Sequence, residues 1–498
     1  MQDKLKVHNS LIGKKEFFKP IKEGYIGMYV CGPTVYSDVH MGNVRTFVSF
    51  DMIYRFLKYL KFKIRYVRNI TDVGHLVGDV DTGAEDKISK KARLEQVEPM
   101  EIVQTYSDGF HDVMKAYNTL SPSIEPRATG HIIEQIEMVE QIIKNGYGYE
   151  ANGSVYFDTI KFAEDKGVYG NLSGKILDDL LVETRTDLKN QSDKKHPSDF
   201  AIWIKASPDH IMRWNSPWSV GFPGWHLECS AMSTKYLGQQ FDIHGGGNDL
   251  KFPHHENEIA QNYGCCDTAP ARYWLHTNML LMNGRKMSKS ENNSITPEEL
   301  RTGDSVHVSK SFAEPIVRFL MMQTHYRSTL DITDTALIAA EKGYNRLMGA
   351  YNILSELDTS SIKGSLDSDI NSQLDQVLAD MLDDFNTPKA LASMFGIVPK
   401  INSLKEGKID LSKIGKETLD RMKTVFHDII FDVLGLLNIT KSTGDDNKLD
   451  DVMSLILELR QQARADKNWA LSDEIRDKLI DLGIQLKDGK DGTTFSVN

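Results

Sequence analysis

Cysteine is scarce in this sequence, with four residues in a chain of 498. So few cysteines cannot build a disulfide framework in a chain of this length. We therefore expect a protein of the reducing cytoplasm whose cysteines serve metal binding or chemistry. Cys265 and Cys266 are adjacent and follow a predicted helix. We interpret them as structural residues, although they are rival candidates for metal ligands.

Long apolar runs are missing as well. No stretch has the roughly 20 apolar residues that a membrane-spanning helix needs, and the first ten residues, MQDKLKVHNS, lack the apolar segment of a signal peptide. The sequence therefore predicts a protein without a membrane partner.

An excess of positive charge is also absent, because the formal net charge is −11. This balance argues against a protein that coats nucleic acid non-specifically. It leaves room for local basic patches that contact phosphate. Net charge alone therefore excludes few functions here.

The length of the chain predicts several domains, because one hydrophobic core rarely serves this many residues. The content of 40% hydrophobic and 26% charged residues is typical of globular proteins. Changes of sequence pattern predict six parts: the first half of a nucleotide-binding domain (1–120), an insertion (121–213), the second half of that domain (214–285), a connecting region (286–330), a helical bundle (331–440) and a small mixed α/β domain (441–498).

A βαβ unit is predicted near the N-terminus, after a short lead-in with strand character. The apolar run YIGMYV at 25–30 predicts a buried strand, and helical periodicity begins at about Gly42. KIRYVRNI at 63–70 predicts a second strand, parallel to the first. Ligands bind at the carboxyl ends of such strands, where a helix N-terminus also offers amides to phosphate. Three polar residues fall at this edge: Cys31, His40 and Thr71.

The stretch 224–258 carries a candidate metal site. His254 and Glu258 are four residues apart on a predicted helix that starts near Pro253, so they share one face. Cys229 lies on a second predicted helix, and Cys31 is the candidate for a fourth ligand. Zinc accepts Cys, His and Glu together. The alternative is a solvated His/Glu pair with a cysteine that only packs.

A zinc-protease motif is excluded in the same stretch. That motif needs H-E-x-x-H on a helix, whereas Ile259 stands three residues after the pair His255-Glu256.

Later segments predict further elements. QFDIHGGGND predicts a strand followed by a glycine-rich turn, although it lacks the G-x-G-x-x-G spacing. KMSKS at 286–290 follows a hairpin-like stretch; its lysines could clamp polyphosphate, or the loop is only a solvated basic one. Thr387-Pro388 predicts a helix start with the threonine as cap. KSTGDDNK at 441–448 predicts a linker, followed by two helices and a β-hairpin.

Five segments together resemble the cysteinyl-tRNA synthetases, a family of class I aminoacyl-tRNA synthetases, and the likeness runs to the C-terminus. The segments are MYVCGPTVYSDVHMGNVRTFVSFD at 28–51, NITD at 69–72, GWHLECSAM at 224–232, FDIHGGGNDLKFPHHENEIAQ at 241–261 and KMSKS at 286–290. The family's first nucleotide signature appears here as His40-Met41-Gly42-Asn43, with Met in place of the usual Ile. The chain departs from the family after NITD, where Gly74-His75 and extra residues to about 85 replace acidic ones.

The resemblance implies a fold and a set of site residues. The fold is α/β, a Rossmann-like parallel nucleotide-binding domain split by an insertion, followed by a helical bundle and a small anticodon-binding domain. The implied zinc ligands are Cys31, Cys229, His254 and Glu258, with His255 and Glu256 as supporting or structural groups. Cysteine would contact Gly32, Thr71, Trp225 and His244. ATP would contact Thr34, His40, Gly42, Asn43, Gly245, Gly246, Asp249, Lys286 and Lys289.

The implied reaction joins L-cysteine to tRNA(Cys) at the expense of ATP, with Mg²⁺ accompanying ATP and zinc recognising the substrate thiolate. His40, Asn43, Lys286 and Lys289 are the residues implied to act on the phosphates. Stacking and phosphate contact make Arg464, Trp469 and Arg476 candidates for tRNA binding, although each could equally be structural or solvated. The resemblance also implies a cytoplasmic monomer.

Two other functions remain open from the sequence. A cysteine ligase that uses a small amine in place of tRNA would share the zinc and ATP motifs, but it would not need residues after about 440. A zinc-containing RNA-binding protein with a degenerate site is the non-enzymatic alternative. The intact HMGN and KMSKS segments argue against it.

Overall fold

The computed structural model describes residues 1–498 except for a few segments. Those segments are 75, 78–84, 176–192, 209, 288–292, 440–442, 467, 483, 490–491 and 498. Contacts divide the chain into two compact units, Met1–Leu437 and Asn438–Asn498. Each unit is described by itself. The boundaries predicted inside the first unit remain predictions.

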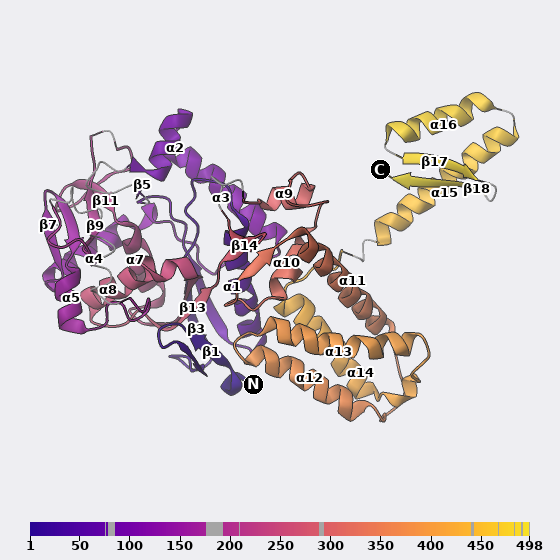
Figure 1. The fold of residues 1–498 in the computed structure, drawn as a ribbon, viewed down its shortest axis with the longest axis horizontal. Coiled ribbons are helices and arrows are strands. Elements are labelled where there is room, and N and C mark those ends of the chain that lie inside the picture. Colours follow the sequence, from indigo (N-terminus) through magenta and orange to yellow (C-terminus); the bar gives the residue numbers. More distant parts are fainter. Residues whose placement is uncertain are drawn as a thin grey trace. The chain divides into compact units, whose positions relative to one another are not determined.

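A four-stranded parallel sheet forms the centre of the first unit (Figure 1), in the order β13-β12-β3-β4. Its strands are β3 (Tyr25–Val30), β4 (Lys63–Arg68), β12 (Phe241–Gly247) and β13 (Ala271–Thr277). Helix α1 (Met41–Tyr59) connects β3 to β4, and α8 (His254–Cys266) connects β12 to β13. The predicted parallel βαβ unit is confirmed by the pairing of Tyr25 with Lys63 through Val30 with Arg68.

The two connections leave the centre of the sheet in opposite directions. From β3 the chain moves outward to β4, and from its neighbour β12 it moves outward to β13. Such a reversal of strand order opens a crevice at the carboxyl ends of the two central strands. Helix α7 (Trp225–Leu237), which precedes β12, packs against α8. These elements position the functional site.

The glycine-rich turn predicted after β12 is wrong. Gly245, Gly246 and Gly247 continue the strand and pair with Leu275, His276 and Thr277 of β13. The glycines serve close packing instead, since a Cβ atom on Gly245 would lie 2.2 Å from the ring of Phe50 on α1. Propensity disfavours glycine in a strand, but tertiary packing of a helix onto the sheet overrides it here.

An insertion with its own antiparallel sheet separates the two halves of the parallel sheet. The sheet order is β10-β11-β9-β8-β7, and helices α4 (Ile132–Lys144) and α5 (Thr159–Lys166) belong to the same region. The strands are β7 (Gly148–Ala151), β8 (Ser154–Phe157), β9 (Phe200–Lys205), β10 (Trp214–Asn215) and β11 (Val220–Pro223). The last two strands extend this sheet beyond the predicted end at residue 213.

The remaining elements of the first unit surround this framework. The N-terminal part has η1 (Gln2–Lys4), β1 (Lys6–Asn9) and β2 (Lys14–Phe17), and the segment after β4 has β5 (Leu76–Val77), β6 (Glu85–Asp86), α2 (Lys87–Glu95), α3 (Pro99–Ala116) and η3 (Thr129–His131). After β12 and β13 come η6 (Asn248–Lys251), β14 (Leu280–Met282), β15 (Arg285–Lys286), α9 (Pro297–Thr302), α10 (Glu314–Met322) and β16 (Leu330–Ile332). The predicted hairpin before KMSKS is confirmed by the antiparallel pairing of β14 with β15.

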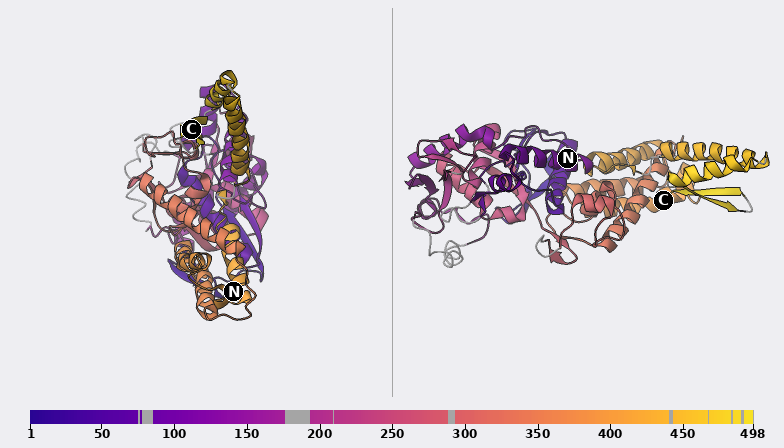
Figure 2. Two further views of the ribbon diagram at one scale, coloured as in Figure 1. Left: turned by 90° about the vertical axis from the view of Figure 1, so that its right-hand side faces the viewer. Right: turned by 90° about the horizontal axis from the view of Figure 1, so that it is seen from above.

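A helical bundle completes the first unit, and Figures 1 and 2 show it on the side of the parallel sheet away from the insertion. Its α-helices are α11 (Asp334–Glu356), α12 (Asp367–Leu382), α13 (Thr387–Lys405) and α14 (Lys416–His427). A short 3-10 helix, η7 (Leu411–Lys413), precedes α14, and a π-helix, η8 (Asp428–Val433), follows it. The predicted cap of α13 is wrong by one residue. Asn386, and not Thr387, caps this helix, since its side chain accepts a bond from the Lys389 amide.

Buried arginines attach the bundle to the parallel sheet. Arg318 of α10 is 1% exposed, pairs with Asp51 of α1 and donates to the carbonyl of Leu434 at 2.7 Å. Arg55 donates to the same carboxylate at 2.8 Å. A buried carboxylate that accepts from two guanidinium groups is stabilised only while both remain in place. The position of α1 is therefore tied to that of the bundle.

The second unit contains two helices and a hairpin, as predicted. They are α15 (Thr443–Ala465), α16 (Trp469–Asp481), β17 (Ile484–Gly489) and β18 (Gly492–Val497). The predicted linker is wrong for residues 443–448, which already belong to α15. Residues 441 and 442 lie outside the described residues. Among the described residues, no helix combines the length and the apolarity needed to cross a membrane.

The close contact of Gly245 with Phe50 predicts a matched pair of stability effects. Gly245→Ala should lower the free energy of unfolding by about 1–3 kcal/mol, because overpacking forces α1 or Phe50 to shift. Gly396→Ala is the control, since a Cβ atom there meets nothing within 4 Å inside a helix; it should be neutral or stabilising by about 0.5–1 kcal/mol. Chemical denaturation of both variants measures the difference. Equal effects would contradict the packing role.

Candidate active site and metal centre

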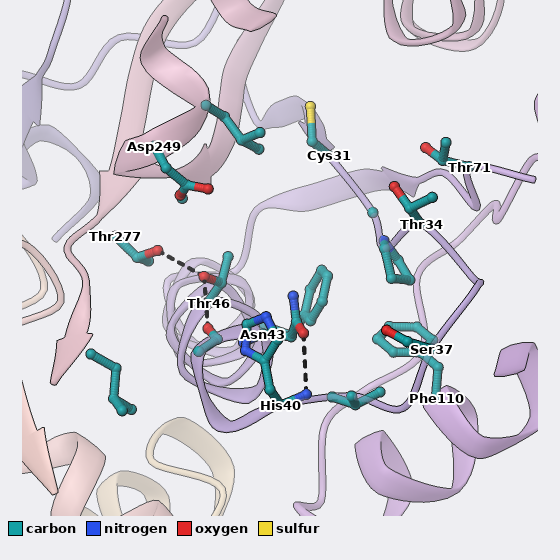
Figure 3. Close-up of a pocket in the computed structure, with 18 of the residues that line it drawn as sticks. Cys31, Thr34, Ser37, His40, Asn43, Thr46, Thr71, Phe110, Asp249 and Thr277 are labelled. Carbon is teal, nitrogen blue, oxygen red and sulfur yellow. Dashed lines mark hydrogen bonds between the residues drawn. The ribbon is translucent and has the colours of Figure 1, made fainter. Parts of the chain in front are cut away.

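A cavity of about 570 Å³ opens at the carboxyl ends of β3 and β12, where the strand order reverses. It gathers most of the residues that the sequence singled out, and Figure 3 shows several of them facing one another. The predicted residues that line it are Cys31, Gly32, Thr34, His40, Gly42, Asn43, Thr71, Trp225, Cys229, Asp249, His254 and Lys286.

Other predicted residues lie behind the wall of the cavity or outside the described residues. His244, Gly245 and Gly246 are buried on β12 and are not among the lining residues. Sequence reasoning could not separate the two groups because strand residues alternate between faces, and which face meets the cavity depends on packing. Lys289 and its neighbours Ser288 and Ser290 lie outside the described residues.

Four predicted metal ligands are brought together at one end of the cavity. Ligand atoms of Cys31, Cys229, His254 and Glu258 all lie within 4.8 Å of one another, and all four side chains are buried. The two sulfur atoms are 3.6 Å apart, and Nε2 of His254 lies 3.2 Å from Oε1 of Glu258. Two thiols, an imidazole and a carboxylate form a donor set that suits zinc.

A second cluster shares two of these residues. Cys31, His244, His255 and Glu258 also have ligand atoms within 4.8 Å. Cys229 and His254 line the cavity, whereas His244 and His255 do not. The first set has three members on the cavity wall and the second has only Cys31, so the first is better placed to present a metal ion to a ligand in the cavity. The rival ligands Cys265 and Cys266 belong to neither cluster.

The electrostatics of the cluster favour a cation. Burial raises the pKa of the Cys31 thiol well above its usual value, and burial raises the pKa of Cys229 to about 12. Both thiols would stay protonated at neutral pH with only protein around them. A divalent ion reverses this balance, because a coordinating thiol loses its proton. The residues present therefore fit a metal ion.

Two histidines contact the ligand residues directly, and the first of them, His226, was missed by sequence reasoning. Nδ1 of His226 lies 2.9 Å from Nδ1 of His254, which directs the Nε2 atom of His254 toward the ligand cluster. His244 and Glu258 are joined at 2.7 Å between Nε2 and Oε2. The spacing of His226 and Cys229, three apart on one helix, was the signal available in the sequence.

A hydrogen-bonded chain leads to Cys31 from the other side. Burial holds the pKa of His255 and of His276 well below the usual value, so both rings are neutral. His276 contacts Ser10 and His255, each at 2.8 Å, and Nε2 of His255 lies 3.3 Å from the Cys31 sulfur. In the consistent arrangement His255 donates its N–H to that sulfur. This confirms the supporting role expected for His255 and adds His276 and Ser10.

Glu256 has a structural role, as expected. Its carboxylate accepts bonds from the amides of Gly170 and Ser173 at 2.8 and 2.9 Å. It therefore anchors the insertion to α8 and takes no part in the ligand cluster.

The N-terminus of α1 forms another wall of the cavity. His40 caps the helix, since its Nδ1 accepts from the Asn43 amide, while Oδ1 of Asn43 accepts from the His40 amide, both at 3.3 Å. An imidazole that accepts at Nδ1 carries its proton at Nε2, and the Asn43 side chain keeps its NH₂ donors. Figure 3 shows both side chains at this end of α1. The arrangement suits an anionic ligand, because the dipole of α1 points the same way.

Two glycines and two threonines set the shape of the cavity. A Cβ atom on Gly32 would lie 1.6 Å from the Asn69 carbonyl oxygen, so only glycine lets the end of β3 approach the NITD segment. A Cβ atom on Gly42 would lie 2.9 Å from the His40 ring. The Thr46 hydroxyl lies 3.1 Å from that of Thr277 and donates to the Gly42 carbonyl at 3.3 Å, which links the start of α1 to the end of β13.

The residues proposed from sequence for nucleic acid lie in the second unit. Arg464 is on α15, and Trp469 and Arg476 are on α16. Trp469 is 57% exposed, which is unusual for so large an apolar side chain and leaves its ring accessible.

Two family models and several full-length relatives match this chain. A model described as "tRNA synthetases class I (C) catalytic domain" matches residues 17–342, and a "DALR domain" matches residues 376–438. A cysteine--tRNA ligase of Phocaeicola vulgatus is 48% identical over 503 residues, which cover 100% of both chains. Those of Cytophaga hutchinsonii and Deinococcus radiodurans are 49% and 45% identical, with at least 96% of each chain covered.

Solved structures support the same fold. A methionyl-tRNA synthetase of Mycobacterium tuberculosis matches with a TM-score of 0.59 and 12% identity, covering 84% of this chain and 92% of that one. An Agrobacterium radiobacter LeuRS matches with a TM-score of 0.57 and 12% identity, covering 84% and 85%. At this identity the likeness concerns the fold, which agrees with the split parallel sheet described above. Together with the family models and the full-length relatives, it means that the chain belongs to the cysteine–tRNA ligase family of class I aminoacyl-tRNA synthetases.

Proposed function

We propose that this chain is a cysteine–tRNA ligase, which activates L-cysteine with ATP and transfers the cysteinyl group to tRNA(Cys). One observation supports the proposal above all others. A buried Cys/Cys/His/Glu cluster and the N-terminus of α1 form two walls of the same cavity. One wall suits a thiol and the other suits phosphate. Relatives named for this activity match along the whole chain, which supports the same reaction.

Cys31, Cys229, His254 and Glu258 would hold a zinc ion. When bound there, zinc prefers a thiolate to a hydroxyl ligand and lowers the pKa of a bound thiol, which separates cysteine from serine. An apolar pocket would not suffice for that choice, because it discriminates poorly between near-isosteres. His226 and His244 would keep the imidazole and the carboxylate of the cluster in position.

The rest of the amino acid would lie against three residues of the cavity. The ring of Trp225 lies 4.5 Å from that of His254, and the Thr71 hydroxyl donates to Glu228 at 2.5 Å. Gly32 gives the substrate access to the backbone at the end of β3. His244 would act through Glu258, since it does not line the cavity. The direct substrate contact expected for His244 stays a prediction.

In the first step the cysteine carboxylate attacks the α-phosphorus of ATP and pyrophosphate leaves. No nucleophile from the protein is needed, because positioning and charge stabilisation supply the rate. His40 and Asn43 would donate to phosphate oxygens from the N-terminus of α1. Lys286, at the edge of the cavity, and Lys289 would stabilise the leaving pyrophosphate, and Mg²⁺ would accompany ATP.

The adenosine of ATP would lie against Asp249 and the end of β12. Gly245 would contribute by letting α1 approach β12, and Gly246 by leaving room for the His255 ring.

In the second step a hydroxyl of the terminal tRNA ribose attacks the carbonyl of cysteinyl-adenylate, which forms the ester to tRNA, breaks the bond to phosphate and releases AMP. The second unit would bind the distant anticodon end, with Trp469 available for stacking and Arg464 and Arg476 for phosphate. A monomer remains our expectation for the enzyme.

The zinc assignment predicts a selective loss of metal. Purified chain should contain one zinc ion, and Cys229→Ala should lose it, because three remaining ligands hold zinc less tightly. Elemental analysis of both proteins measures this. Cys266→Ala is the matched control and should keep its zinc. Full zinc content in Cys229→Ala, or its loss from Cys266→Ala, would refute the ligand set.

The contact between Gly42 and His40 predicts a catalytic effect from one methyl group. Gly42→Ala should displace the His40 ring and slow cysteinyl-adenylate formation by about 10–100-fold, since small misplacements of a positioning group are costly. Cysteine-dependent exchange of pyrophosphate into ATP measures the rate. Gly349→Ala is the control, because a Cβ atom there meets nothing within 4 Å. An unchanged rate in Gly42→Ala would mean that the placement of His40 is unimportant.

Because the chain forms two compact units, we expect that cysteine activation can be separated from tRNA charging. A chain ending at Leu437 should retain pyrophosphate exchange, because all described residues of the cavity lie in the first unit. Its KM for tRNA should rise by about 100-fold or more, if two or three base contacts of about 1–3 kcal/mol each are lost. Charging assays on the folded truncation, with full-length protein as control, measure this. Undiminished charging would contradict a role of the second unit in tRNA binding.

A further inference from the structure

Two adjacent cysteines lie at the end of α8 that is remote from the ligand cluster. The sulfur atoms of Cys265 and Cys266 are 3.0 Å apart, and both residues are partly exposed. Their helix carries His254 and Glu258 in its first two turns. Eight residues separate Glu258 from Cys266, which places the pair about 12 Å along the helix from the cluster. The reaction proposed above does not use these thiols.

A resident metal ion does not explain the pair. Soft thiolate ligands suit zinc, but a structural zinc site needs four ligands. Among the described residues, no third ligand group joins Cys265 and Cys266 in a cluster. The nearest acidic neighbour in sequence, Asp267, is paired with Lys166 of α5 at 2.6 Å. The alternative to metal binding is a reaction between the two thiols themselves.

The two cysteines differ in their surroundings. Cys265 packs against an apolar cluster that includes Val139 and Ile142. Its carbonyl oxygen accepts a bond of 2.9 Å from the side chain of Asn145. Cys266 is the last residue of the helix, and Asp267 follows in a left-handed conformation with φ of 54°. One thiol is thus held against the core, and the other is at the free end of the helix.

This asymmetry favours ionisation of Cys266. The contact between the two thiols lowers the pKa of Cys266 to about 7, and the same contact together with burial raises the pKa of Cys265. The neighbouring charges, Lys166 and Asp267, balance each other. At neutral pH a substantial fraction of Cys266 would therefore be thiolate, the form that attacks disulfides.

We propose that Cys265 and Cys266 form a dithiol site for exchange with small-molecule disulfides, which closes a disulfide between the two residues. The Cys266 thiolate attacks one sulfur of the small disulfide and expels the first thiol as a thiolate. Cys265, after losing its proton to solvent, attacks the Cys266 sulfur and expels the second. The protein loses two protons and two electrons, and the small disulfide is reduced to two thiols.

The site should be reversible. Cα atoms of neighbouring residues are about 3.8 Å apart, closer than the 4.4–6.8 Å usual for disulfides. A disulfide between neighbours is consequently easy to reduce, which is a property of regulatory and not of structural bonds. The ligand cluster is protected from the same chemistry, because Cys31 and Cys229 are buried and would be held by the metal ion.

The experiment uses the full-length, zinc-loaded enzyme and oxidised glutathione as the disulfide. Released glutathione is counted by a thiol assay after the protein is removed, and modified peptides are identified by mass spectrometry. The wild-type enzyme should release two glutathione molecules for each protein disulfide formed and retain none. The peptide containing Cys265 and Cys266 should lose two hydrogens and regain them with dithiothreitol.

Serine variants separate the two roles. Cys265→Ser should stop after the first attack, so one glutathione is released and one stays on Cys266. Cys266→Ser should react at least about 10-fold more slowly, because the remaining thiol of Cys265 packs against an apolar cluster and its burial raises its pKa. The double variant should show no exchange while keeping pyrophosphate-exchange activity and an unchanged thermal transition. The wild-type rate should rise with pH and reach half its maximum near pH 7, the pKa of Cys266.

Three results would overturn the proposal. In the first, the double variant consumes as much oxidised glutathione as the wild type. In the second, the modified peptide contains Cys31 or Cys229. In the third, the wild type retains glutathione and forms no internal disulfide, which would make Cys266 a site of simple thiolation.

Discussion

The structure of the site depends on four metal-binding groups held together in the interior. Two thiols and a carboxylate that belong to Cys31, Cys229 and Glu258 lie beside the imidazole of His254, each at most 5% exposed. Burying such groups without a cation is unfavourable, which is visible in the raised pKa of both thiols through burial. The surrounding histidines offset part of this cost with their N–H groups, and a divalent ion would complete the compensation. Folding of the site and metal binding are consequently linked.

The split parallel sheet explains how ligands from distant parts of the sequence meet. Cys31 follows β3 directly, while Cys229 lies on α7 and His254 begins α8, about 200 residues later. Because β3 and β12 are neighbours at the point where strand order reverses, both reach the same crevice. The insertion separates the two halves of the domain in the sequence, yet β3 and β12 remain paired. The same crevice receives the N-terminus of α1, so the thiol-binding and phosphate-binding walls face one cavity.

Buried charge also fixes the phosphate-binding wall. Helix α1 carries His40 at its start, and two of its later residues, Arg45 and Asp51, are buried. Arg45 donates to the carbonyl oxygens of Met321 and His325 at 2.6 and 3.0 Å, and Asp51 pairs with Arg318. A buried ion that loses its partner is costly, so α1 has little freedom to slide. Helix α10 and the segment after it thereby hold α1 in place.

The sequence by itself determined the parallel βαβ unit, the helices of the metal-binding stretch and the four candidate ligands, because these follow from local periodicity and from the chemistry of side chains. It could not determine the course of the chain at Gly245, which continues a strand because Phe50 packs against it. It also could not reveal that His244 lies behind Glu258 or that Ser10 reaches His276, since such contacts join residues far apart in the chain. Local propensity acts over a few residues, whereas the side of a strand that faces a cavity, and the partner of a buried imidazole, are decided by packing between elements. Tertiary structure therefore decided which candidate ligands form one site and which of them face the cavity.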